Sequence, residues 1–195
     1  VRGSGREYSE QMTVTQLTEQ MIASYARVGG INRLDETNLP SKSAITVITD
    51  DLLRLLFPGF FTDNPIHSYD VKMVTANLMD AVKGRLEDEV YKSLLYSKHD
   101  PAKARAEATD ITCKFLTRLP AIRELLQTDG EAAFNGDPAA LSKDEVIVAY
   151  PFIEAIAVQR LAHELYQLGV ALIPRIMTEW AHARTGIDIH PGAKI

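Results

Sequence analysis

Apolar side chains recur at intervals of three and four residues along most of the chain, which is the spacing expected of amphipathic helices. The first such stretch covers residues 9–28 and stops at a pair of glycines, which favour the end of a helix. A second helix is expected from Ser41 or Ser43, either of which can cap it, to about residue 56. Its residues 45–49 are β-branched and also suit a strand, but the two aspartates that follow and the later leucine spacing favour a helix.

A near-heptad stripe of aliphatic residues predicts a long third helix that begins at residue 68 or 69 and ends at about residue 97. The stripe consists of Val71, Val74, Leu78, Val82, Leu86, Val90 and Leu94. The motif Phe57-Pro58-Gly59 separates this helix from the one before it, because proline and glycine both interrupt helices.

The next helix is expected to open at Asp100-Pro101, since aspartate caps a helix and proline fits its first turn. It continues until Pro120, which breaks or kinks it. A short helix to residue 127, a polar turn and a further helical stretch over residues 131–135 complete this part.

The last third of the chain predicts three helices joined by short breaks. Ser142 caps a short helix, and Pro151 occupies the first turn of a longer one that Gly169 ends. The final helix covers about residues 171–184 and stops before Gly186, with a proline in its first turn.

A different period follows the last helix, because Ile189 and Ile195 are six residues apart with the small Ala193 between them. A six-residue period with an aliphatic residue at one corner is typical of the first coil of a parallel β-helix. The predicted fold is therefore an all-α N-terminal helical domain that leads into the start of a parallel β-helix. The expected domains are a first helix and linker over 1–40, a helical domain over 41–185 and a first β-helix coil over 186–195.

Composition excludes several classes of function. The chain has 195 residues, a net charge of −5 and no cluster of lysine and arginine, so a nucleic-acid groove is not expected. No apolar run approaches the roughly 18 residues needed to span a bilayer, and the polar start lacks a signal-peptide pattern, so no membrane is expected. Cys113 is the single cysteine, which favours a cytoplasmic location and a thiol buried in the core.

Three groups of residues carry a resemblance to a known family. They are Asp137-Pro138-Ala139, Arg160-Leu161-Ala162-His163-Glu164-Leu165-Tyr166 and Thr185-Gly186-Ile187-Asp188-Ile189-His190-Pro191-Gly192-Ala193-Lys194-Ile195. In these groups and their spacing the chain resembles the serine O-acetyltransferases of cysteine biosynthesis, and Phe57-Pro58-Gly59-Phe60-Phe61 is similar to their longer, divergent branch. The resemblance is strong from the first of these groups to the end of the chain and weaker before it.

The resemblance implies an enzyme that moves acetyl from acetyl-CoA directly to the hydroxyl of L-serine, with no permanently bound cofactor. It also implies a left-handed parallel β-helix of hexapeptide repeats. Nearly all of it is absent from this chain, so the catalytic histidine and the acetyl-CoA groove are expected beyond Ile195. The expected assembly is a homotrimer or hexamer, with cysteine as a feedback inhibitor. O-acetylserine sulfhydrylase is the expected partner, through a tail that also lies beyond this chain.

Asp188 is the expected catalytic residue, since the resemblance makes it the carboxylate that orients the general-base histidine. A buried aspartate that accepts from one ring nitrogen fixes the tautomer and leaves the other nitrogen free to take the serine proton. Without the resemblance, Asp188 is interpreted as a solvated residue at a corner of the β-helix.

Asp137 and Pro138 are the expected substrate-binding residues. By resemblance Asp137 lies in the serine pocket, where its carboxylate suits the ammonium group of an amino acid, and Pro138 contributes shape only. An aspartate before a proline also starts helices commonly, and Asp100-Pro101-Ala102 shows the same three letters. Only the spacing to His163 and Asp188 distinguishes the two motifs.

Metal sites are not expected. His163 is followed by Gln167 at the position where a zinc-protease helix needs its second histidine. Glu179 and His182 form only one of the two pairs that a di-iron bundle needs. His190 is expected to be structural or solvated.

Two other interpretations remain open beside acetyl transfer to serine. The chain as given can be a helical oligomerisation module without activity, because the histidine and the acetyl-CoA groove are absent from it. It can also belong to a hexapeptide acyltransferase with another acceptor, although the paired matches at Asp137 and Asp188 favour serine.

Overall fold

The computed structural model describes residues 12–195 and divides the chain after Glu36 into two units, which are described separately. The elements of the first unit are α1 (Val14–Arg27) and the short 3-10 helix η1 (Gly29–Ile31). The helix expected over residues 9–28 is thus confirmed from residue 14 onward, and its residues 9–11 lie outside the described part of the chain.

α1 begins with a capping box. The Thr13 side chain accepts from the backbone N–H of Gln16, and the Gln16 side chain accepts from the backbone N–H of Thr13. None of the residues of α1 is buried. Its exposed apolar side chains are Val14, Leu17, Met21, Ile22 and Tyr25.

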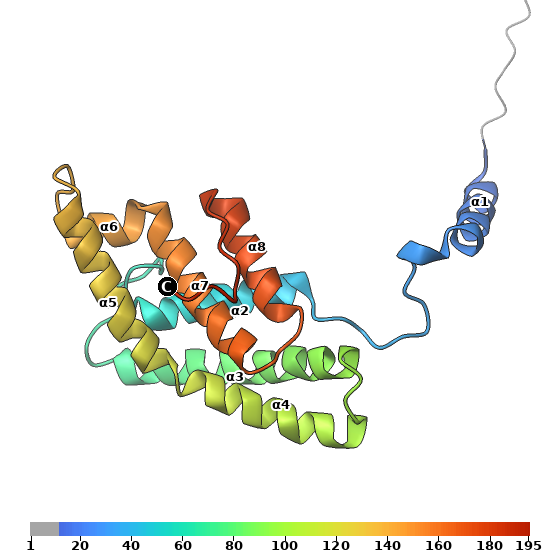
Figure 1. Ribbon diagram of the computed structural model, residues 1–195, viewed down its shortest axis with the longest axis horizontal. Helices are drawn as coiled ribbons and strands as arrows, with labels where there is room; N and C mark the ends of the chain where they lie inside the picture. Colours follow the sequence, from blue (N-terminus) through green and yellow to red (C-terminus); the bar gives the residue numbers. More distant parts are fainter. Residues whose placement is uncertain (1–11) are drawn as a thin grey trace, which may run out of the picture. The chain divides into compact units, whose positions relative to one another are not determined.

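The second unit, Thr37–Ile195, is a bundle of helices (Figure 1). They are α2 (Lys42–Leu56), α3 (Val71–Tyr96), α4 (Pro101–Leu116), α5 (Leu119–Gly136), α6 (Lys143–Ala149), α7 (Pro151–Gln167) and α8 (Ile173–Thr185). Ser41, Asp100 and Ser142 cap α2, α4 and α6 by accepting from backbone N–H groups, as the sequence predicts. No residue of the described range 12–195 lies in a β-strand, so the helical part of the expected fold is what the structure contains.

α2 and α7 make most of the contacts that hold the second unit together. α2 packs against α3, α5, α7 and α8, and α7 packs against α5 and α8 as well (Figure 1). Their fully buried side chains include Ile45, Ile48 and Leu52 of α2 and Ile153, Leu161 and Leu165 of α7. Burial of each such side chain stabilises the fold by about 1.5–3 kcal/mol, so the positions of these two helices are strongly determined.

The structure corrects the prediction for the region of α5. This helix continues through the polar turn expected after residue 127, and Gly130 lies inside it. The reason is a contact that sequence spacing does not reveal: Arg160 of α7 donates to both carboxylate oxygens of Asp129, at 2.9 Å each. This bidentate pair ties the middle of α5 to α7 and offsets the cost of about 1 kcal/mol for glycine in a helix.

The region of α4 confirms one expectation and corrects another. The break expected at Pro120 is present, since α4 ends at Leu116 and the proline lies in the first turn of α5. The prediction of a buried thiol is wrong, because Cys113 is exposed. The buried residues of α4 form one stripe, and Cys113 falls outside it. These buried residues are Ala104, Ala108, Ile111, Thr112 and Phe115.

The described helices are short or polar relative to a membrane span. No single helix within residues 12–195 is both long and apolar enough to cross a membrane. Taken together, α6 and α7 are long and apolar enough for a bent span, by length and composition only, with an angle of 72° between them.

Candidate functional site

Asp137, one of the two carboxylates singled out by the sequence, lies at the C-terminal cap of α5. Its side chain accepts two hydrogen bonds, one on each oxygen. The Tyr150 hydroxyl donates to Oδ2 at 2.5 Å, and the backbone N–H of Ala139 donates to Oδ1 at 2.9 Å. Pro138, which lies between Asp137 and Ala139 in sequence, is exposed in the turn before α6.

These contacts move the pKa values of Asp137 and Tyr150 apart. The hydrogen bond from Tyr150, followed by that from the backbone of Ala139, lowers the pKa of Asp137 below its ordinary value of 3.8. The same bond raises the pKa of Tyr150 from 10.0 to about 12. At neutral pH Asp137 is therefore a carboxylate, and Tyr150 remains a protonated donor.

Asp188, the second carboxylate, follows the end of α8. Gly186 ends that helix with φ 73°, a left-handed conformation in which glycine is favoured because it lacks a Cβ. The Asp188 carboxylate lies 3.9 Å from the guanidinium of Arg175, and half of the side chain is exposed. This exposure differs from the buried aspartate that the proposed role requires, and in residues 12–195 no histidine bonds to it.

The segment that carries Asp188 lies along α7 (Figure 1). Gln159 donates to the carbonyl oxygen of Ala193 at 2.8 Å, and Nδ1 of His163 lies 2.8 Å from the carbonyl oxygen of Pro191. Farther along, Arg160 donates to the carbonyl oxygen of Ile195 at 3.3 Å. α7 thus satisfies three backbone carbonyl groups of this segment, which we call the terminal segment (residues 186–195).

Close packing of Gly192 against His190 and Tyr166 fixes the turn of the terminal segment. The rings of Tyr166 and His190 pack edge to face with centroids 5.9 Å apart. Nδ1 of His190 accepts from the backbone N–H of Gly192 at 3.0 Å, which agrees with the structural role expected for this histidine. A Cβ at Gly192 would lie 3.1 Å from that nitrogen and 3.2 Å from the Tyr166 ring, so the space accommodates glycine best.

α7 therefore contacts both loops that carry a predicted site residue. Tyr150, immediately before its first turn, bonds to Asp137, while Gln159 and His163 bond to the terminal segment that contains Asp188. No hydrogen bond or ion pair joins the two carboxylates to each other within residues 12–195. Residues at the start and on the face of α7 thus bond to Asp137 and to the segment that carries Asp188.

The other candidates of the sequence have ordinary structural contacts. Asp100 accepts from the backbone N–H of Ala102 and caps α4. Gln167 bonds to Nε2 of His163 at 3.1 Å, on the helix face where a zinc ligand would have to be. Glu179 pairs with Arg175 and lies 3.9 Å from His182. Among the residues that the structure describes, no three histidine, cysteine, aspartate or glutamate side chains form a group that could hold a metal ion.

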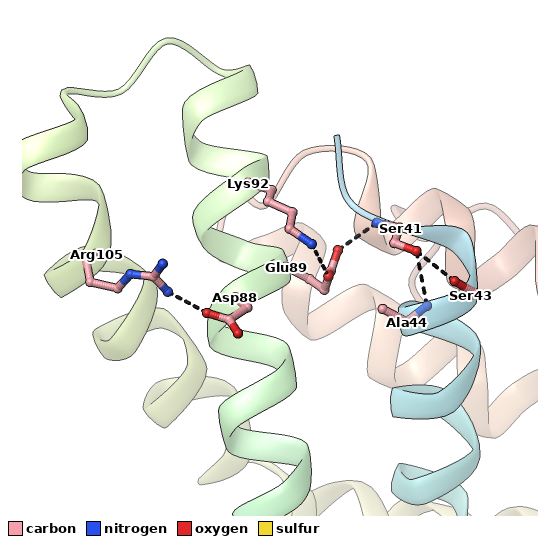
Figure 2. Close-up of polar contacts among 7 residues, drawn as sticks. All are labelled: Ser41, Ser43, Ala44, Asp88, Glu89, Lys92 and Arg105. Carbon is pink, nitrogen blue, oxygen red and sulfur yellow. Dashed lines mark hydrogen bonds and ion pairs between the residues drawn. The ribbon is translucent and has the colours of Figure 1, made fainter. Parts of the chain in front are cut away.

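One polar cluster was not predicted from the sequence. Glu89 of α3 is buried, and its carboxylate accepts from the backbone N–H of Ser41 and from Lys92, each at 2.6 Å (Figure 2). Nearby, Asp88 pairs with Arg105 of α4 at 2.7 Å. Since Glu89 joins the N-cap of α2 to α3, we interpret it as a clamp between the start of α2 and the C-terminal half of α3.

A cavity of about 760 Å³ lies between α2, α3, α5 and α6. Its wall is mainly apolar and includes Leu56, Met79 and Ile147. Neither Asp137 nor Asp188 lines it. The predicted site residues therefore lie outside this cavity.

In sequence the chain is similar to known serine acetyltransferases. No family model matches the chain. Over 165 residues, or 80 % of the chain, it is 39 % identical to "Serine acetyltransferase, plasmid" of Synechococcus elongatus. It is 44 % identical over 70 residues to "Serine acetyltransferase" of Synechocystis sp.. These matches cover 51 % of the first relative and 28 % of the second, so the chain spans about half or less of their length.

Solved structures of serine acetyltransferases are similar to this chain in fold. The native serine acetyltransferase 1 of Entamoeba histolytica is similar over 91 % of this chain, with a TM-score of 0.63 and 27 % identity. Isoform 3 from the same organism, solved in complex with cysteine, has a TM-score of 0.62 and 27 % identity. The chain covers 62 % and 59 % of these two structures.

Proposed function

Because the chain is a homologue of the serine acetyltransferases and corresponds to the N-terminal helical part of their structures, we propose that it is the helical part of an enzyme that acetylates L-serine. In the proposed reaction the serine hydroxyl oxygen forms a bond to the acetyl carbon while the thioester C–S bond of acetyl-CoA breaks. The products are O-acetyl-L-serine and the free thiol of coenzyme A, in the first step of cysteine biosynthesis.

Asp137 is proposed to bind the ammonium group of serine. The supporting observation is the geometry of its carboxylate, which two neutral donors hold from its own loop and from Tyr150. Each carboxylate oxygen has two acceptor positions, so one position per oxygen remains available for the ammonium group. Pro138, exposed beside it, is proposed to contribute shape to the same pocket.

Asp188 is proposed to orient the general-base histidine, which is expected beyond Ile195. In its present surroundings the carboxylate is half exposed and weakly paired with Arg175, so it has acceptor positions to offer. The proposed left-handed β-helix begins in the terminal segment, and its first coil is held on α7 by Gln159 and His163. Residues that follow would cover Asp188 and supply the histidine.

The rest of the proposal concerns co-substrate, assembly and location. Acetyl-CoA is the proposed co-substrate, with no permanently bound cofactor, and the cytoplasm is the proposed location. A homotrimer or hexamer is proposed, with cysteine as a feedback inhibitor at the serine pocket. The solved isoform 3 in complex with cysteine supports the binding of cysteine by analogy. O-acetylserine sulfhydrylase remains a proposed partner.

The observation that carries the proposal is the held, ionised carboxylate of Asp137 in a chain 39 % identical to a serine acetyltransferase. The test is release of coenzyme A thiol from acetyl-CoA, measured on this chain and on a longer protein that continues past Ile195. We expect activity with L-serine in the longer protein only. Activity with sugars but not serine would favour another acceptor. No activity in either protein, combined with assembly of the helices in light scattering, would favour an oligomerisation module.

A further inference from the structure

Tyr150 has an unusual place in the chain, because a single residue joins two helices. It is both the C-terminal cap of α6 and the N-terminal cap of α7. Its backbone N–H donates to the carbonyl oxygen of Val146, and its carbonyl oxygen accepts from the N–H of Ile153. The ring packs edge to face on Phe152, with centroids 6.5 Å apart. Two helices therefore fix the backbone position of Tyr150 and the direction of its side chain.

The Tyr150 hydroxyl reaches back across 13 residues to Asp137. Its 2.5 Å bond to one carboxylate oxygen links the start of α7 to the end of α5, across the stretch that contains α6. The other oxygen accepts from Ala139, a contact within the same short loop. Of these two contacts, only the bond from Tyr150 relates the carboxylate to α7, the helix that also holds the terminal segment.

The partners of Asp137 are neutral, whereas several other hydrogen-bonded carboxylates of this protein have cationic partners. Asp129 is paired with Arg160, Asp51 with Arg85 and Glu89 with Lys92. Asp137 forms no ion pair with a residue of the described range 12–195. An arginine or lysine in place of the tyrosine would neutralise the carboxylate and repel a second cation. A neutral hydroxyl orients the group and leaves its negative charge for a ligand.

We propose that Tyr150 is a positioning residue, which aims the Asp137 carboxylate at the ammonium group of an amino-acid substrate; the role rests on the proposed function. The tyrosine itself does not touch the reacting atoms. It acts by holding Asp137 at a fixed place relative to α7, and hence relative to the terminal segment.

Tyr150→Phe in the longer protein that continues past Ile195 tests the role. The substitution keeps the ring that packs on Phe152 and removes only the hydroxyl. Loss of a hydrogen bond to a charged group corresponds to a decrease of about tenfold or more in kcat/KM for serine. We expect this decrease to appear mainly in KM for serine, with KM for acetyl-CoA unchanged. The matched control is Tyr69→Phe, whose exposed ring stacks on His67 and whose kinetic constants should stay those of the wild type.

A pH profile separates positioning from a merely structural effect. Without the tyrosine donor the pKa of Asp137 returns toward 3.8, so the acid limb of kcat/KM for serine should move to higher pH. An unchanged KM for serine, or equal losses for both substrates with an unmoved acid limb, would overturn the role of Tyr150 while leaving the proposed function intact. A wild-type protein without serine turnover would overturn the proposed function and the positioning role together.

Discussion

The buried side chain of Gln159 donates a hydrogen bond of 2.8 Å to the carbonyl oxygen of Ala193, which lies 34 residues later in the chain. The contact joins α7 to the terminal segment at a point where water has little access. Because a buried amide without a partner is costly, this bond specifies where the chain leaves the helical bundle. It therefore determines the direction in which any following β-helix would start.

Replacement of Gln159 by leucine should loosen the terminal segment. The substitution leaves the carbonyl oxygen of Ala193 without its buried donor, which costs about 1–3 kcal/mol. Urea denaturation should show the lower stability, and hydrogen exchange should show faster exchange of the amides in residues 186–195. Gln127→Leu, at an exposed position of α5 whose side chain bonds to Glu131, is the matched control and should change neither measurement appreciably. Equal behaviour of the two variants would contradict the proposed role of the Gln159 hydrogen bond.

A methyl group at position 192 should destabilise the turn of the terminal segment. The added Cβ would lie 3.1–3.2 Å from His190 and Tyr166, so these rings must shift. Gly192→Ala is expected to lower the free energy of unfolding by about 1–3 kcal/mol, as overpacking does. Gly130→Ala is the control, since no atom lies within 4 Å of the added Cβ and the residue is inside α5. It should stabilise the protein by about 0.5–1 kcal/mol, and a loss there would argue against a continuous α5.

The buried clamp at Glu89 should contribute more stability than its exposed neighbour. Glu89→Gln weakens two charge-assisted bonds, to Ser41 and Lys92, and should lower the free energy of unfolding by about 1.5–3 kcal/mol. Asp88→Asn removes the pair with Arg105, whose side chains are 66 % and 55 % exposed, and should cost about 0–1 kcal/mol. Thermal and urea denaturation would show which of the two variants loses more unfolding free energy. The reverse order would show that Glu89 is not a clamp.

The bond between Tyr150 and Asp137 should make stability depend on pH in two windows. The pKa of Asp137 is lowered in the folded protein, so its contribution is present above 3.8 and is lost as pH falls through the folded pKa. The pKa of Tyr150 is raised from 10.0 to about 12, so its contribution is present below 10.0 and is lost as pH rises toward 12.

The difference in unfolding free energy between wild type and Tyr150→Phe reports this bond. It should be constant between pH 3.8 and 10.0 and should shrink on both sides of that range. A difference that does not change with pH would mean that the bond does not couple the two ionisations. Tyr69→Phe provides the baseline for a tyrosine that stays exposed.

Much of the helical fold could be predicted from the sequence, because its signals are local. Serine and aspartate caps at positions 41, 100 and 142 start helices where expected, and Gly169 and Gly186 end them with positive φ. The continuity of α5 could not be predicted, since it depends on an ion pair between Asp129 and a residue of α7. Long-range pairs leave no trace in local spacing.

The candidate site was predictable only in part. Asp137 and Asp188 were identified by resemblance, and their roles stay predictions. Tyr150 was not identified from the sequence, because nothing in a tyrosine before a proline reveals a partner in an earlier loop. Burial was also hard to predict from sequence: Cys113 is exposed although Thr112 beside it is buried, and Glu89 is buried although it is charged.

The most direct measurement is serine-dependent release of coenzyme A by the longer protein, compared among Asp137→Asn, Asp188→Asn and Asp100→Asn. We expect a strong rise in KM for serine with the first substitution and a large fall in kcat with the second. The third removes an aspartate that only caps α4 and should leave turnover unchanged. Wild-type turnover in both of the first two variants would contradict the assignment of acetyl transfer to these carboxylates.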